Sequence, residues 1–213
     1  MIKNNYSRRK AINLPLPSEK LAEFIGIFLG DGSFRNKYQI AVSYNHKNEI
    51  EYADYIENLI AYLFGLKTKR LIREKYGSAD IIANSSNLVD FLSDELMLAD
   101  IKKKDKFILP KWVWKSDKYK MGFIRGLFDA EGCVYRHTYI SNKKVYTYKK
   151  IAITNYSSRV LVLLKNLLLE TGFHPAIYHN RVHLYTQQEV NSFFGLIGTN
   201  NNKNRLRFEK SLP

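Results

Sequence analysis

FIGIFLGDG at residues 24–32 and IRGLFDAEG at residues 124–132 are two copies of one pattern in a chain of 213 residues. Both copies are mostly apolar and end in an acid followed by glycine, with Asp31 in the first and Glu131 in the second. The two acids stand 100 residues apart. A segment that recurs at this distance indicates two structural modules, each of which begins with the same helix.

The similarity continues after each acid. QIAVSYN, from Gln39, matches KIAITNY, from Lys150, and both alternate apolar with polar residues as half-buried strands do. Each copy then has a helix, two strand-like runs and a second helix, the helices being expected at residues 48–64 and 157–171 and near residues 87–98 and 188–197. Each copy closes with a basic segment that ends in Leu-Pro.

This order predicts an α+β fold in which two αββαββα modules, residues 1–112 and 113–213, form a saddle of antiparallel sheets. A twofold repeat also predicts pseudo-twofold symmetry, with the modules packed on a matching element. We expect that element to be the pair of motif helices, on which small residues recur four apart on one face: Gly26, Gly30, Gly126 and Ala130. Glycine inside a helix costs about 1 kcal/mol relative to alanine, and close backbone packing would explain its use.

Such packing would bring Asp31 and Glu131 side by side. Two carboxylates repel each other, and a helix C-terminus carries partial negative charge of its own. A divalent cation relieves both problems, and the backbone carbonyls of Gly30 and Ala130 would add the oxygen ligands that Mg²⁺ prefers. Water activated by such an ion is a nucleophile for phosphodiester hydrolysis. Alternatively, Asp-Gly and Glu-Gly simply end two helices; one copy alone would favour that interpretation, and two matched copies do not.

The balance of charge favours a polyanionic partner. Lys and Arg total 34 against 20 Asp and Glu, which gives a net charge of +14 and a pI near 9.7. Nucleic acid is the first candidate for a surface this basic. Charge alone does not separate DNA from RNA or from an anionic membrane surface, and a Lys-rich coding bias would give the same excess.

The cysteine count and the longest apolar stretch indicate the kind of cellular compartment to expect for this protein. Cys133 is the only cysteine, which excludes an internal disulfide and a cysteine-based zinc site and favours a reducing compartment. The five histidines show no spacing typical of a zinc site. The longest apolar stretch, residues 160–169, is interrupted by Lys165 and Asn166 and is too short to cross a bilayer. We therefore expect a soluble protein with no membrane partner.

Polar and basic residues on the strands mark candidate DNA-binding faces. In the first module they are Arg35, Lys37, Gln39, Ser43, Lys69, Arg73 and Lys75. In the second they are Arg136, Lys143, Tyr148, Lys150, Arg181, His183 and Tyr185. The second module also has a hairpin 11 residues longer than that of the first, rich in Tyr and Lys. We interpret it as a ribbon with longer reach on one half of the target; a solvated loop is the alternative.

The two motifs resemble those of the LAGLIDADG homing endonucleases, and the resemblance covers nearly the whole chain. It is strongest to the class that carries two motifs in one chain and acts as a monomer. It implies a Mg²⁺-dependent hydrolase that makes a double-strand break in a long, asymmetric duplex DNA target, with Asp31 and Glu131 as the metal-binding acids. Leu29 stands where the family name has Asp, a position that is not the catalytic one.

The resemblance further implies a lysine beside the active site in each closing basic segment. Lys203 is the candidate in the second module, and Lys103 in the first, where Lys102 and Lys104 are alternatives. Another function open to this fold is that of an RNA-splicing maturase or a DNA-binding relative that does not cut. The presence of both acids favours an endonuclease, because a protein that only binds a polyanion has no use for a carboxylate pair. We expect an intron-encoded protein rather than one excised from an intein.

Overall fold

A computed structural model describes residues 10–98 and 106–210. The first module contains α1 (Glu19–Asp31), β1 (Gly32–Asn36), β2 (Gln39–Asn45), α2 (Ile50–Phe64), β3 (Thr68–Arg73), the 3-10 turn η1 (Glu74–Tyr76), β4 (Ser78–Asn84), α3 (Ser86–Asp90) and the π-helical turn η2 (Phe91–Glu95). After the 3-10 turn η4 (Lys111–Lys115), the second contains α4 (Asp117–Glu131), β5 (Gly132–Ser141), β6 (Lys144–Thr154), α5 (Ser158–Glu170), β7 (Ala176–Tyr178), β8 (Arg181–Leu184), α6 (Gln187–Leu196) and α7 (Asn202–Glu209).

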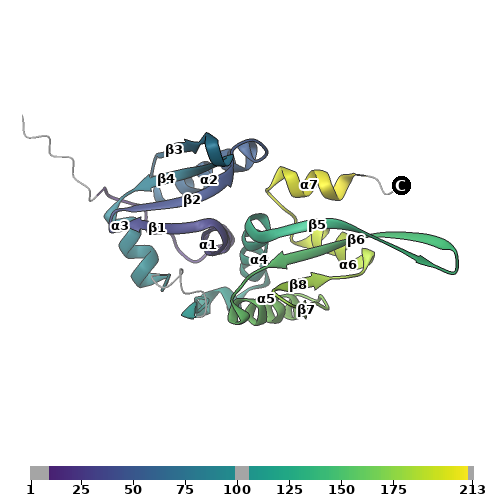
Figure 1. Cartoon of the computed structure of the whole chain (residues 1–213). Helices are drawn as coiled ribbons and strands as arrows, with labels where there is room; N and C mark the ends of the chain where they lie inside the picture. Colours follow the sequence, from purple (N-terminus) through teal and green to yellow (C-terminus); the bar gives the residue numbers. More distant parts are fainter. Residues whose placement is uncertain (1–9, 99–105, 211–213) are drawn as a thin grey trace, which may run out of the picture.

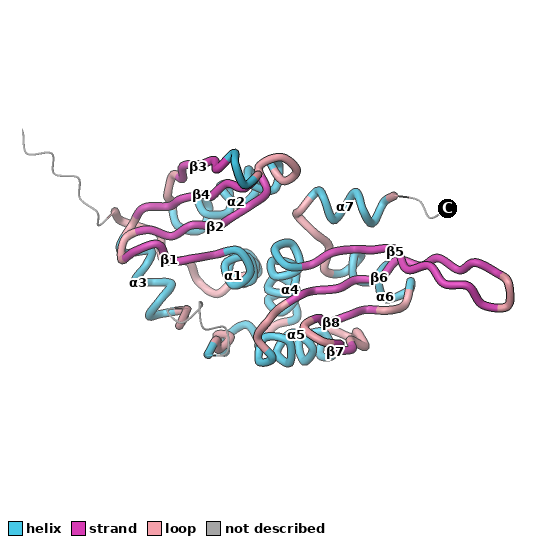
Figure 2. The backbone as a smooth tube through the Cα atoms, in the orientation of Figure 1, coloured by secondary structure: helices cyan, strands magenta, loops and turns pink. Residues whose placement is uncertain are grey.

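The two modules have the same sheet topology. Each has four antiparallel strands, in the order β1-β2-β4-β3 in the first module and β5-β6-β8-β7 in the second. The modules lie side by side with α1 and α4 between them (Figure 1), and Figure 2 shows the two sheets in the same view. The matching order confirms the expected α+β fold of two repeated modules.

Helices cover one face of each sheet. In the first module the paired residues Val42 and Ile81 are completely buried on that face, and in the second Ile153 and Val182 take the same place. Because side chains alternate along a strand, the residues between them lie on the opposite side. We call this side of each sheet the outer face; Gln39, Ala41 and Ser43 lie on it in β2, and Tyr148, Lys150 and Ala152 in β6.

The most extensive contact between any two elements is that of α1 with α4. A Cβ atom on Gly126 would lie 2.0 Å from the carbonyl oxygen of Glu23, and one on Gly26 would lie 2.3 Å from that of Phe123. Neither position has room for a methyl group, because both neighbours are backbone atoms. The two helices therefore pack backbone against backbone, which only glycine allows.

Each motif helix is followed directly by a glycine in extended conformation, with φ of −81° at Gly32 and −97° at Gly132. These glycines are therefore not left-handed caps. A Cβ on Gly32 would lie 2.3 Å from the Phe28 carbonyl oxygen, and one on Gly132 would lie 2.5 Å from that of Phe128. Glycine lets the chain turn straight from the helix into the first strand of the sheet.

The longer hairpin of the second module is the largest difference between the sheets. β5 and β6 have 10 and 11 residues, against 5 and 7 in β1 and β2. Pairing continues to Ser141 and Lys144, so the hairpin is a regular two-stranded ribbon that projects beyond the sheet (Figure 1). Asn142 and Lys143, both at positive φ, form its tip.

Within residues 10–98 and 106–210, no helix combines the length and the apolar character that a bilayer crossing requires.

Replacing Gly126 by alanine should destabilise the protein by about 3 kcal/mol or more, because overpacking forces the helix backbones apart. Gly195→Ala is the matched control, since a Cβ at Gly195 meets no atom within 4 Å, and a helical alanine there should be neutral or stabilising by up to about 1 kcal/mol. Urea unfolding of both variants measures the difference. Equal stability of the two variants would contradict the backbone packing described here.

Candidate active site and nucleic-acid surface

Asp31 and Glu131 are the last residues of α1 and α4, and the two helix ends meet. A Cβ atom on Gly30 would lie 2.4 Å from the Cβ of Ala130 and 3.1 Å from the Cγ of Glu131. The closest approach of the last turns therefore falls at the residues that precede the two acids. Both acids are partly exposed.

The donor set suits a hard cation. The helix ends supply two carboxylates, and the carbonyl groups of a last helical turn have no partners within the helix. Across residues 10–98 and 106–210, no group of three or more His, Cys, Asp and Glu side chains gathers in a way that could hold a metal ion. Two carboxylates with carbonyl oxygens are few protein ligands for Ca²⁺, whereas Mg²⁺ keeps several waters and commonly binds one or two carboxylates.

Tyr52 of α2 lies close to this group of acids. It is 1% exposed, and its hydroxyl has no hydrogen-bond partner among the described residues. Burial raises the pKa of Tyr52 well above its ordinary value, and the charges of Asp129, Asp31, Glu23 and Glu49 raise it further. Four acids therefore lie within electrostatic reach of this buried hydroxyl.

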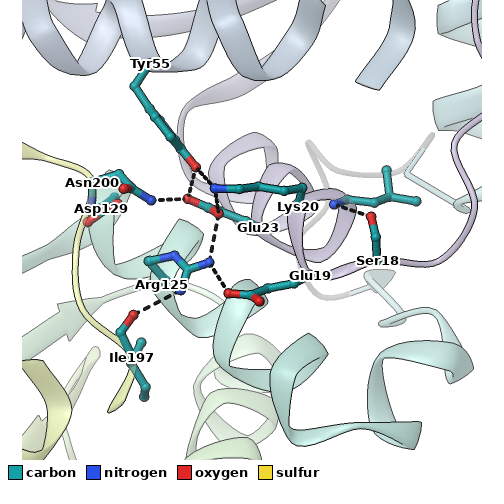
Figure 3. Close-up of polar contacts among 10 residues, drawn as sticks. Ser18, Glu19, Lys20, Glu23, Tyr55, Arg125, Asp129, Ile197 and Asn200 are labelled. Atoms are coloured by element: carbon teal, nitrogen blue, oxygen red, sulfur yellow. Dashed lines mark hydrogen bonds and ion pairs between the residues drawn. The ribbon is translucent and has the colours of Figure 1, made fainter. Parts of the chain in front are cut away.

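A buried ion pair joins α1 to α4 (Figure 3). Glu23 is 0% exposed, and Arg125 Nη2 donates to Glu23 Oε2 at 2.9 Å and to Glu19 Oε1 at 2.6 Å. Tyr55 and Asn200 also donate to Glu23, each at 2.5 Å. Burial alone would raise the pKa of Glu23, but the hydrogen bond and charge of Arg125, with smaller contributions from Tyr55 and Lys20, hold it below its ordinary value.

A loop of the second module closes over the end of α4. The Asn200 N–H donates to Asp129 Oδ2 at 2.8 Å, and the Thr199 hydroxyl donates to Asp129 Oδ1. Burial raises the pKa of Asp129 to about 7, against the opposing effect of these hydrogen bonds. Asn201 Nδ2 donates to the Asp129 carbonyl oxygen and to Glu49 Oε1, both at 3.0 Å, so this loop contacts both modules.

Lys203 lies at the start of α7, two residues after this contact. Its Nζ forms an ion pair with Glu49, the residue before α2 in the other module. Burial opposes the charge of Glu49, but hydrogen bonds from Lys203, Asn201 and the Asn45 N–H keep its pKa below the ordinary value. Lys203 is thus fixed near the helix ends by a residue of the first module. Lys103 lies outside the described residues.

Most residues predicted for the DNA-binding surface of the first module lie on one side of its sheet. Register places Gln39, Ser43, Lys69 and Arg73 on the outer face, and Arg35 reaches it through a hydrogen bond to Asp80. Lys37 lies in the turn between β1 and β2, and Lys75 in η1. By contrast, Arg70 lies on the helix side, where it pairs with Asp54 and Glu57 of α2.

The outer face of the second sheet is aromatic. His183 stacks on Tyr185 with ring centroids 5.0 Å apart, and Lys150 Nζ lies 5.0 Å from the Tyr185 ring. Burial lowers the pKa of His183, and the charges of Arg181 and Lys150 lower it further, which favours the neutral imidazole. Along the ribbon, rings of the two strands stack on each other, with centroids 5.4 Å apart for one pair and 6.0 Å for another: Tyr139 with Tyr146, and Tyr139 with Tyr148.

One predicted residue of the second module does not share this face. Arg136 pairs in register with Lys149, whose ammonium donates to the Phe208 carbonyl oxygen of α7, so Arg136 lies on the helix side. Tyr135 takes the place on the outer face instead, where its hydroxyl approaches His183. The error comes from a choice of strand phase, because Val134, Tyr135 and Arg136 give no clear alternation. Lys143 is at the tip of the ribbon.

Several residues that form contacts in only one of the two modules were not predicted from the sequence. Arg125 stands where the first motif has Ile25, and Asp129 stands where it has Leu29, so comparing the copies could have flagged both as charges that need partners. Glu49 and Asp80 carry no such signal. Each is an ordinary acid in the sequence, and its role depends on contacts across the fold.

Comparison with known proteins identifies relatives of this architecture. Residues 118–212 match the family model described as a LAGLIDADG-like domain. An uncharacterized protein of Methanocaldococcus jannaschii is 27% identical over 179 residues, 82% of this chain and 56% of that protein. The replication factor C small subunit of the same organism is 32% identical over 126 residues, 58% of this chain and 6% of that protein. The chain thus spans about half the length of the first relative and a small part of the second.

Solved structures show the same fold. Full-length DUF199/WhiA from Thermatoga maritima has a TM-score of 0.58 at 17% identity, over 94% of this chain and 64% of that chain. The LAGLIDADG meganuclease I-AabMI bound to uncleaved DNA has a TM-score of 0.58 at 16% identity, over 87% of each chain. I-DmoI in complex with DNA and Ca has a TM-score of 0.55 at 18% identity, over 84% of this chain and 88% of that chain. At these identities the similarity shows the fold alone.

The ion pair of Glu23 and Arg125 predicts a pH-dependent contribution to stability. Because the folded protein lowers the pKa of Glu23, its carboxylate stabilises the fold above about pH 4.5, and this contribution is lost as pH falls through the lowered pKa. Glu23→Gln should therefore destabilise the protein by about 3 kcal/mol at pH 7, and by less near pH 3.

Glu19→Gln is the control for this prediction, since Glu19 contacts the same arginine from a side chain that is 41% exposed. Glu19→Gln should lower the free energy of unfolding by at most about 1 kcal/mol. Urea unfolding at the two pH values measures both variants. A Glu23→Gln penalty that does not change with pH would show that the carboxylate is not the stabilising form.

Proposed function

We propose that this chain, which has the fold of two-motif LAGLIDADG structures and whose residues 118–212 match the LAGLIDADG-like domain model, is a site-specific homing endonuclease. Its substrate would be a long, asymmetric duplex DNA target, in which it makes a metal-dependent double-strand break. The observation that carries the proposal is the close packing of α1 and α4, which end at Asp31 and Glu131 and approach each other at Gly30 and Ala130. Each module supplies one acid to a single centre.

The residues divide the chemical work. Asp31 and Glu131, with the carbonyl groups of Gly30 and Ala130, would hold the divalent ion, for which we propose Mg²⁺. When bound, the ion supplies an activated water and charge stabilisation for phosphodiester hydrolysis. Lys203, whose ammonium pairs with Glu49, would stabilise negative charge that develops on the phosphate. We assign the same role to Lys103 in the first module.

The two outer faces would bind the two halves of the target. They are joined in one chain, so a monomer would present both at once. Arg35, Lys69 and Arg73 make the first face basic, whereas rings and Lys150 dominate the second. Different chemistry on the two faces suits a target whose halves differ in sequence.

A relative of the same fold that binds nucleic acid without cutting, such as a maturase, is the second candidate. The fold does not choose between the two, because the TM-score is 0.58 both for DUF199/WhiA and for the meganuclease I-AabMI. The concentration of carboxylates at the helix ends favours cleavage. In a protein that only binds a polyanion, these carboxylates would weaken the binding.

Asp31→Asn and Glu131→Gln should each lower the rate of plasmid cleavage by about 100-fold or more, because each removes one of two charges that hold the metal. The substrate is a plasmid that carries the intronless insertion site, incubated with Mg²⁺ or with EDTA. Duplex binding should stay within about tenfold of that of the parent protein. Absence of metal-dependent cleavage by the parent protein would contradict the endonuclease function. It would favour the second candidate, a protein that binds nucleic acid without cutting it.

Salt should weaken duplex binding steeply if the basic outer faces contact phosphates. Counterion release predicts a loss of about 1000-fold in affinity between about 50 and 200 mM salt. Fluorescence anisotropy with a labelled duplex measures the slope. An affinity that barely changes with salt would contradict binding through these faces.

A further inference from the structure

A buried carboxylate lies in the middle of the outer face of the first sheet. Asp80 of β4 is 2% exposed and pairs in register with Ser43 of β2. Its neighbours Ala79 and Ile81 point to the helix side, where both are completely buried. An acid at the centre of a surface that binds a polyanion opposes that binding. Its presence on this face therefore needs another explanation.

Asp80 is the common acceptor of three side chains. Ser43 Oγ donates to its Oδ1 at 2.8 Å, and Arg35 Nη2 donates to its Oδ2 at 2.7 Å. Arg73 Nη2 donates to the same Oδ2. Arg35 comes from β1 and Arg73 from β3, which are the two edge strands of the sheet. The two arginines thus reach toward its centre from opposite sides and meet on one carboxylate.

The carboxylate fixes the arginines without covering them. Their side chains remain 39% and 38% exposed, whereas that of Asp80 is 3% exposed. An unsupported surface arginine moves among many rotamers, and ordering it on binding costs about 0.5–1.5 kcal/mol. A guanidinium that is already hydrogen-bonded at one Nη avoids most of this cost. It can still present other N–H groups outward, since it has five in a fixed plane.

A fixed planar donor is more than a phosphate contact requires. A phosphate can also accept two N–H groups of one guanidinium, but a mobile lysine binds phosphate too, so this contact does not require an arginine fixed in place. The major-groove edge of guanine, whose N7 and O6 both accept, requires two parallel N–H donors in a defined position. Two arginines held on one carboxylate therefore fit base recognition better than backbone contact.

The arrangement is confined to one module. Arg181 stands opposite Thr154 in β6 as Asp80 stands opposite Ser43 in β2. The second sheet thus has a cation where the first has a carboxylate. The recognition that Asp80 supports would apply to one half of the target only.

We propose that Asp80 is a specificity-determining residue that holds Arg35 and Arg73 in place to read guanine bases in the half-site bound by the first module. This inference rests on the proposed binding of duplex DNA. It does not require cleavage. The role of Asp80 is positioning, since the arginines make the contact.

The test is selection of binding sites from duplexes randomised in both halves, with Asp31→Asn as the non-cleaving parent. The parent should select guanine at one or more positions of one half-site. Adding Asp80→Asn should reduce that guanine preference roughly tenfold, and leave the other half-site unchanged. Affinity for unrelated duplex should not fall, because the change removes a negative charge. A purely structural role would weaken both halves and unrelated duplex together.

Asp54→Asn is the matched control, because Asp54 binds Arg70 on the helix side and the same charge is removed. It should leave the guanine preference intact. Arg73→Lys keeps the cation and loses the planar fork, so it should lose the preference as Asp80→Asn does, even if the latter folds poorly. Guanine preference that survives both Asp80→Asn and Arg73→Lys would overturn the inference. A parent that selects no duplex at all would instead overturn the proposed function.

Discussion

The rest of the structure depends on how closely α1 and α4 approach each other. A Cβ atom on Gly126 would lie 2.0 Å from the Glu23 carbonyl oxygen, so the two backbones leave no space for a side chain at this point. This contact joins the modules, and it also decides where the helices end relative to each other. Because Asp31 and Glu131 close the two helices, the same packing that buries the interface brings two negative charges together. The site is therefore a consequence of the interface, and two carboxylates placed in this way attract a cation.

Around this symmetric centre, the chain is built asymmetrically. Arg125 supplies a buried cation from α4, where α1 has Ile25, and Asp129 accepts hydrogen bonds from Thr199 and Asn200, where α1 has Leu29. Glu49 reaches across the modules to Lys203, whereas Ser157 at the matching position before α5 serves as an ordinary helix cap. The outer faces differ in the same way, with arginines on an acid in one and stacked rings in the other. A repeated fold can thus keep a matched pair of acids while the surfaces of its two halves differ in chemistry.

The repeat made much of this predictable from sequence. Two motifs with matched strands after them predicted the α+β topology of both modules, and the structure confirms it. The alternation of apolar and polar residues in β2 and β6 predicted which side chains face the core, because helices cover one face of each strand. Strand phase was wrong at Arg136, where the ribbon leaves the sheet and both faces are exposed, so no burial pattern marks the inner side. Single-copy contacts such as Asp80 with Arg35 join residues 45 apart in the chain, and no local pattern encodes them.

The central claim is that the two acids serve one centre, and Mn²⁺ binding to the protein on uncleaved target duplex tests it directly. Electron paramagnetic resonance titration counts the ions that remain bound in the parent protein, in Asp31→Asn, in Glu131→Gln and in the double variant. One shared centre predicts that each single substitution removes the same ion, so the double variant loses no more than either single one. Losses that add would show two independent sites and contradict the account.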